Sequence, residues 1–110
     1  KTSPKDLAIH LEESLEGKLL KKDSQKFFRD TLLHVKNKSL IKRGLGDHAK
    51  FAHKTGTIGI CVGDAGVIYL DKKKKASISI IVQRPFNNLN GQQIIREISK
   101  MVYERLQQGQ

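Results

Sequence analysis

The chain has few of the residues that cross-link small proteins or bind metals in them. Among its 110 residues there is one cysteine, Cys61, so no disulfide can close within the chain and nothing requires an oxidising compartment. No histidine adjoins Cys61, and we interpret it as a small buried apolar residue. The four histidines share no ligand spacing, so we expect neither a metal nor another cofactor.

Long apolar runs and aromatic side chains are also scarce. No run approaches the ~20 residues of a membrane helix, and the first residues lack the apolar segment of a signal peptide. Aromatic residues make up 5% of the chain and hydrophobic residues 37%, which predicts one domain with a modest core. Several aliphatic stretches argue against disorder.

Positive charge, in contrast, is abundant. The chain has 21 Lys and Arg against 11 Asp and Glu, a net charge of +10 that would attract nucleic acid or an anionic membrane. Lysines at 21–22 and 72–75 fall where a linker and a hairpin turn are expected, and there they would be solvated. The interleaved aromatic and basic residues of RNA-binding sheets are absent. A basic nucleic-acid-binding domain is therefore the hypothesis that we rank lowest.

Residues 1–36 have the periodicity of two amphipathic helices. Thr2 or Ser3 can cap the first helix, and Asp23 or Ser24 can cap the second. The first helix has leucines four residues apart: Leu7, Leu11 and Leu15. The apolar stripe of the second helix is Phe27, Phe28, Leu32 and Val35. Residues 37–49 contain Gly44 and Gly46, break the pattern and are expected to form a loop.

Residues 50–84 predict three strands, at 50–57, 62–70 and 76–83, and their short connections favour an antiparallel sheet. Residues 88–107 predict a final helix that covers one face of the sheet, with Asn88 or Asn90 as its cap. Its apolar stripe is Ile94, Ile98, Met101, Val102 and Leu106. The whole chain, 1–110, is thus expected to be one α+β unit of order α-α-β-β-β-α, an antiparallel sheet with flanking helices.

The first predicted strand contains a possible anion-binding motif, Lys54-Thr55-Gly56-Thr57. Strand alternation places Lys54 and Gly56 on one face and His53 on the other. An ammonium among small neighbours can approach a carboxylate or phosphate, while hydroxyls supply directional donors. The alternative is an edge strand whose exposed lysine and threonines reflect β-propensity alone.

The sequence around this motif resembles the penicillin-recognising serine hydrolases, particularly the class A β-lactamases. The stretch FAHKTGTIGICVGDAGVIYL is similar to their Lys-Thr-Gly strand, which lies beside the active site, and to the strand that follows. Residues 2–45 resemble the segment between the catalytic Ω-loop and that strand, and residues 76–106 resemble the last strand and C-terminal helix. The resemblance covers nearly the whole chain but only the family's C-terminal portion, and implies a partial β-lactamase/transpeptidase-like fold.

The resemblance implies a role for four residues in substrate binding. Lys54 and Thr55 match residues that bind the substrate carboxylate. Gly56 matches the glycine that keeps the strand face open, and the Thr57 backbone N–H matches one donor of the oxyanion hole.

One departure from the family concerns the residues that bind the substrate carboxylate. Many class A enzymes place an arginine on the next strand, about where this chain has Val62. Arg84, at the end of the third strand, is a candidate substitute, although a surface arginine is the alternative interpretation. Asp64 matches a family aspartate, to which we assign a structural role.

The catalytic residues that the family requires are missing from their expected places. Ser39 and Lys42 match the spacing Ser-x-x-Lys, but Gly44 and Gly46 interrupt the helix that a nucleophilic serine should open. Neither a Ser-x-Asn element nor a deacylating glutamate occurs in a matching position. We therefore expect no catalytic residue in this chain, which alone should not turn over a β-lactam.

The leading hypothesis is the C-terminal part of a serine hydrolase that acts on β-lactams or related amide or ester bonds, with the nucleophile supplied by sequence outside this chain. The alternative is a noncatalytic, truncated family member that serves as a structural, binding or dimerising module. Both predict association with a second copy, another chain or a missing N-terminal part, because an isolated segment exposes Phe27, Phe28 and strand faces. A β-lactamase parent implies a periplasmic or secreted location, while a cytoplasmic one stays open.

Overall fold

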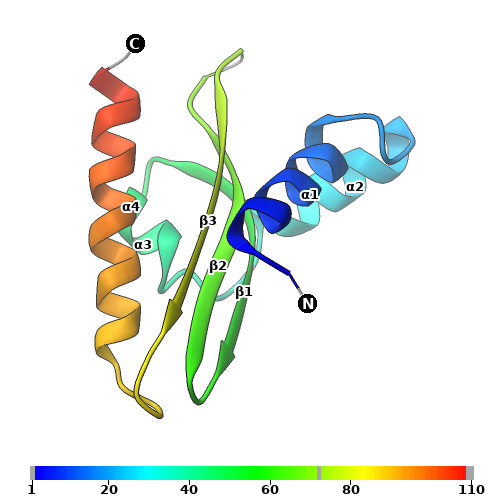
Figure 1. Ribbon diagram of the computed structural model, residues 1–110. Coiled ribbons are helices and arrows are strands. Elements are labelled where there is room, and N and C mark those ends of the chain that lie inside the picture. Colours follow the sequence, from blue (N-terminus) through cyan, green and yellow to red (C-terminus); the bar gives the residue numbers. More distant parts are fainter. Residues whose placement is uncertain (1, 72, 109–110) are drawn as a thin grey trace.

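A computed structural model describes residues 2–71 and 73–108 of the chain (Figure 1). The first lysine of the expected turn, at position 72, therefore lies outside the described residues. Seven elements follow one another along the chain: α1 (Pro4–Glu16), α2 (Lys22–Leu33), α3 (Ile41–Leu45), β1 (Lys50–Ile58), β2 (Cys61–Tyr69), β3 (Lys75–Gln83) and α4 (Asn90–Gln108).

The three strands form one antiparallel sheet of order β1-β2-β3. The register joins Ile58 to Cys61 across the first hairpin and Tyr69 to Lys75 across the second. Figure 1 shows α1 and α2 on one side of this sheet, and α3 and α4 on the other. The predicted fold class, an antiparallel sheet with flanking helices, is confirmed. None of the helices in the described ranges is long and apolar enough to cross a membrane.

Helix α1 begins where its sequence predicts. The Ser3 hydroxyl accepts a hydrogen bond from the Asp6 backbone N–H at 3.1 Å, and Pro4 occupies the first turn, where its missing N–H costs nothing. The leucine stripe of the helix faces the sheet. It forms one of two cores, whose buried residues are Leu11, Leu15, Leu32, Ala52, Ala65 and Val67.

Helix α2 differs in detail from the prediction. It begins at Lys22, after Lys21 in the capping position, so neither Asp23 nor Ser24 is its cap. Of the four residues expected on its apolar stripe, Leu32 is buried but Phe27 is 76% exposed. Phe27 is thus one of the exposed aromatic residues that the sequence led us to expect.

Helix α3 lies within residues 37–49, which were expected to form a loop. The glycine that suggested a break, Gly44, instead permits close packing against α4: a Cβ added there would lie 2.3 Å from the Arg96 carbonyl oxygen and 2.8 Å from Ser99 Cβ. Leu45 is buried within the same helix. Gly46, with φ of 96°, ends the helix as its conformational freedom allows.

Helix α4 covers the sheet with a stripe that matches the predicted one only in part. Ile95 and Ser99 are fully buried, whereas Ile94, Ile98 and Met101 are exposed. The predicted stripe was thus wrong for these three residues, but it was right for Leu106, which packs against the core. The helix presents apolar residues on two sides, and periodicity alone does not say which side meets the sheet. The second core includes Leu40, Ile41, Leu45, Phe51, Val62, Ile68 and Ile95.

Candidate functional site

The four motif residues lie together along one side of a groove of about 480 Å³. Lys54, Thr55, Gly56 and Thr57 all line it, near the end of β1. The opposite wall comes from α1 and α2 and is apolar: Leu7, Leu11, Phe28 and Leu32. The Lys54 side chain and the strand backbone, facing an apolar wall, can hold a ligand that has an anionic group at one end and an apolar group at the other.

Within this groove, Lys54 is exposed, and in the part of the chain that the structure describes its ammonium bonds only to its own neighbour. The Lys54 Nζ donates to the Thr55 carbonyl oxygen at 2.7 Å. A Cβ added to Gly56 would meet nothing within 4 Å, so the strand surface beside Lys54 is open. An incoming anion therefore has access both to the ammonium and to the backbone of the strand.

Directly behind the motif, a buried acid–base pair joins β1 to β2. The His53 Nδ1 lies 2.8 Å from Asp64 Oδ1, and both side chains are buried. The other carboxylate oxygen of Asp64 accepts the backbone N–H of Ile41 at 3.0 Å. Alternation correctly separates His53 from Lys54, but the sequence reading missed the pair. The signal that could have found it is the strand pairing, which sets Asp64 opposite Thr55.

Arg84 is not part of this groove. It is buried, and its guanidinium donates to three backbone carbonyls, of Ile58, Gly59 and Asn88, at 3.1–3.2 Å, and to the Gln92 side chain at 3.0 Å. The surface position considered from the sequence is therefore wrong. Because every guanidinium nitrogen already has an acceptor, we leave Arg84 out of the candidate site.

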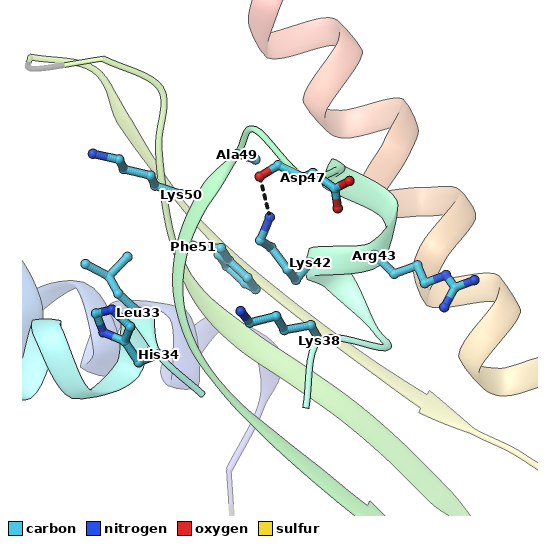
Figure 2. Close-up of a pocket in the computed structure, with 9 residues that line it drawn as sticks. All are labelled: Leu33, His34, Lys38, Lys42, Arg43, Asp47, Ala49, Lys50 and Phe51. Carbon is cyan, nitrogen blue, oxygen red and sulfur yellow. Dashed lines mark hydrogen bonds between the residues drawn. The ribbon is translucent and has the colours of Figure 1, made fainter. Parts of the chain in front are cut away.

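A larger and more basic cavity, of about 820 Å³, lies elsewhere, between α2, α3 and the beginning of β1 (Figure 2). In Figure 2 the Lys42 ammonium points to the backbone of the following loop, and Arg43 points away from the hollow. Lys42 Nζ donates to the carbonyl oxygens of Gly46 and Asp47 at 2.6 and 3.3 Å. Burial lowers the pKa of Lys42, the nearby charge of Lys38 adds to this, and Asp47 opposes it. None of the motif residues lines this cavity.

The Ser-x-x-Lys match also lies apart from the groove. The Ser39 hydroxyl donates to the Asn37 side chain at 2.6 Å, while Lys42 is occupied by the carbonyls described above. Neither residue lines the groove that holds Lys54. Within the described ranges, no group of three or more His, Cys, Asp or Glu side chains is arranged to hold a metal ion.

The sheet, its flanking helices and the Lys-Thr-Gly strand beside a groove define a partial serine β-lactamase-like fold. The sequence profile of the "Beta-lactamase enzyme family" matches residues 1–106, and the chain belongs to this family. No curated protein sequence matches the chain.

Solved structures agree with this assignment. The chain is 36% identical to PBP-A, with a TM-score of 0.91, and is 27% identical to the TLA-1 extended-spectrum β-lactamase, with a TM-score of 0.86. The chromosome-encoded β-lactamase of Vibrio parahaemolyticus, at 24% identity and a TM-score of 0.85, shares the fold. These alignments cover 96–97% of this chain but only 40–41% of the other chains. The chain therefore spans about two fifths of the length of these relatives.

Proposed function

We propose that this chain forms the Lys-Thr-Gly wall of a β-lactamase-like serine hydrolase site. Lys54 and Thr55 bind the carboxylate of a β-lactam or a related amide or ester, and the Thr57 backbone N–H donates to the oxyanion. The nucleophilic serine and the deacylating machinery come from polypeptide outside these 110 residues. In the whole reaction the serine attacks the carbonyl carbon, and water then hydrolyses the acyl-enzyme.

One observation carries this proposal: the four motif residues and four apolar side chains of α1 and α2 line the same groove. A carboxylate placed beside Lys54 replaces the Thr55 carbonyl as the partner of the ammonium, and an ionised acceptor makes the stronger hydrogen bond. The opposite wall can hold an apolar substituent of the ligand. A variant of the PBP-A relative has been solved as an acyl-enzyme complex with penicillin G, which supports this substrate class.

Titration of the ¹⁵N-labelled chain with benzylpenicillin tests the binding step. We expect amide shifts centred on Thr55, Gly56 and Thr57. Lys54→Met should weaken binding by about tenfold or more, because it removes a charge-assisted hydrogen bond. The matched control is Lys50→Met, which removes the same charge from the same strand but lies outside the groove. Equal binding by the two variants would contradict the carboxylate assignment.

The catalytic half of the proposal has its own test. Nitrocefin hydrolysis by the chain alone should stay at the rate of the buffer, since no residue of the groove is an activated nucleophile. A fluorescent penicillin should leave the intact mass of the chain unchanged. Covalent labelling would show that the nucleophile is present and that our assignment of it to other polypeptide is wrong.

A second candidate function is that of a noncatalytic module that associates through its surfaces. Two observations favour it. Among the described residues, nothing pairs with the outer edge of β3, and Ala76–Val82 in that strand carries no charge that would discourage pairing. The exposed side of α4 is also apolar, with Met101 68% exposed. Sedimentation of the chain as a monomer at high concentration would count against this candidate.

A further inference from the structure

The His53 side chain, on the motif strand, is buried and has two partners. Its ring stacks on Phe51, with 4.6 Å between ring centroids and 15° between planes, and Nδ1 bonds to Asp64. Gly66 lies opposite it in register, and a Cβ added there would come within 2.7 Å of His53 Cβ and 2.1 Å of the Ala52 carbonyl oxygen. The histidine therefore fits a space that the neighbouring strand leaves open for it.

Asp64 connects this histidine to two further elements. It lies on β2, where its Cα pairs with that of Thr55, a residue of the motif. One of its carboxylate oxygens lies 2.8 Å from His53 Nδ1 on β1, and the other accepts the Ile41 N–H at the start of α3. One buried carboxylate thus fixes the motif strand, its neighbour and the helix behind them in relation to one another.

We propose that His53 and Asp64 form a positioning pair for the Lys54–Thr57 segment. The His53 side chain does not contact the ligand, because strand alternation directs it to the face opposite Lys54. The pair acts through the backbone: it fixes the strand at the residue before Lys54 and at the cross-strand partner of Thr55. Its effect on ligand binding rests on the function proposed above, whereas its effect on the order of the strand does not.

The chemistry of the pair indicates which nitrogen of the His53 ring makes the hydrogen bond. An ionised carboxylate only accepts hydrogen bonds, so the His53 Nδ1 carries the hydrogen. If that donor is lost, Asp64 keeps a single donor, from Ile41, and a buried charge is left partly unpaired. The strand must then shift or admit water to satisfy the carboxylate, and either change displaces Lys54 and Thr55, the two residues that follow His53 in the strand.

Two substitutions of His53 separate the donor from the bulk of the side chain. The amide nitrogen of asparagine can take the place of Nδ1, while that of glutamine falls nearer to Nε2. His53→Asn should therefore retain the bond to Asp64, and His53→Gln should lose it. A third variant, Ile95→Val, removes one methylene from the core on the same side of the sheet and makes no polar contact with the pair, so it reports loss of stability alone.

The first measurement needs no ligand. We expect a long-range ¹H–¹⁵N spectrum of the wild-type chain to show a protonated Nδ1 on His53. Amides of Lys54–Thr57 that bond to β2 should exchange about tenfold faster in His53→Gln than in His53→Asn, when each rate is normalised to amides of β3 that exchange by global unfolding. Ile95→Val should leave this ratio at its wild-type value.

The second measurement uses benzylpenicillin. His53→Gln should weaken its binding by about tenfold, a loss similar to that of one charge-assisted hydrogen bond, while His53→Asn stays within about twofold of wild type. Absence of binding by the wild-type chain would contradict the proposed function but leave the exchange result to decide the positioning role. An unprotonated Nδ1, or equal normalised exchange in the two His53 variants, would overturn the positioning pair.

Discussion

The Tyr69 hydroxyl donates to Glu16 Oε2 at 2.7 Å and so joins the end of β2 to the end of α1, 53 residues away in the sequence. The same carboxylate accepts from the Lys75 ammonium at 2.7 Å and pairs with Arg29 Nε at 2.9 Å. Glu16, at the end of α1, is therefore the common partner of α2 and of two strands, β2 and β3, at this end of the sheet. Burial, together with the adjoining Glu16 carboxylate, raises the pKa of Tyr69 above its usual range.

The Glu16 cluster predicts a loss of stability in acid. Burial by itself would raise the pKa of Glu16, but hydrogen bonds from Lys75 and Tyr69 and the charge of Arg29 lower it overall from the ordinary value of 4.5. Because the folded pKa is the lower one, the stabilisation is fully present above pH 4.5 and disappears as the pH falls through the folded value.

Urea unfolding at a series of pH values between 7 and 3 measures this effect. Glu16→Gln should be less stable than wild type at pH 7, and the difference should shrink steadily below pH 4.5. The control is Glu104→Gln, which removes the same charge from an exposed position on α4. A difference between Glu16→Gln and wild type that is the same at pH 7 and pH 3 would contradict the prediction.

Arg84 predicts a stability effect at the other end of the sheet. Arg84→Ala removes one donor from each of the carbonyls of Ile58, Gly59 and Asn88, and should lower the free energy of unfolding by about 3 kcal/mol. Arg84→Lys retains the charge but not the planar set of donors, so it should recover only part of this loss. Chemical denaturation of the three proteins checks the order, and full recovery by lysine would show that the charge alone matters.

Replacement of two glycines of the sheet by alanine should affect stability to different extents. Gly66→Ala places a Cβ 2.1 Å from the Ala52 carbonyl oxygen, and should destabilise the chain by about 1–3 kcal/mol. Gly56→Ala meets nothing within 4 Å and should leave stability close to wild type, while it narrows the groove beside Lys54. Thermal unfolding and benzylpenicillin titration distinguish the two effects. Similar melting temperatures for both variants would contradict this account of Gly66.

The exposed side of α4 predicts concentration-dependent association. Met101→Glu should weaken self-association, because it places a charge within the apolar face that also contains Ile94 and Ile98. Gln107→Glu adds the same charge to an exposed polar position of the same helix and serves as the control. Sedimentation equilibrium compares them, and identical association by the two variants would place the contact elsewhere, for example at the β3 edge.

Local patterns of the sequence were sufficient for most elements. Alternating residues predicted the three strands, and the leucine spacing and Ser3 cap predicted α1. The short α3 was missed because Gly44 has a low helix propensity, whereas its actual role is to let α4 approach, a contact between segments about 50 residues apart. Propensity describes the residue alone, and only the tertiary arrangement shows why a glycine belongs there.

In the candidate site, too, local patterns were predictable from the sequence and tertiary contacts were not. Lys54 to Thr57 could be predicted as a site because four consecutive residues carry the motif; all four line the groove, and their role in binding stays a prediction. The bond between His53 and Asp64 depends on the register of two strands and on burial, and neither is apparent from one residue type at one position. Arg84 was misplaced for a related reason: an arginine at the end of a strand is usually solvated, and its acceptors come from a distant hairpin and a following loop.

Different kinds of contact stabilise the two ends of the sheet, and these contacts should differ in their sensitivity to salt. At the Tyr69 end the contacts are pairs of opposite charges that are partly open to solvent, which mobile ions screen over about 10 Å at 0.1 M ionic strength. At the end near Thr57, buried Arg84 is held mainly by neutral carbonyl groups, which ions cannot neutralise. At high salt concentration the contacts at the Tyr69 end of the sheet should therefore weaken first. The groove beside Lys54 lies at the other end, and its walls should keep their shape.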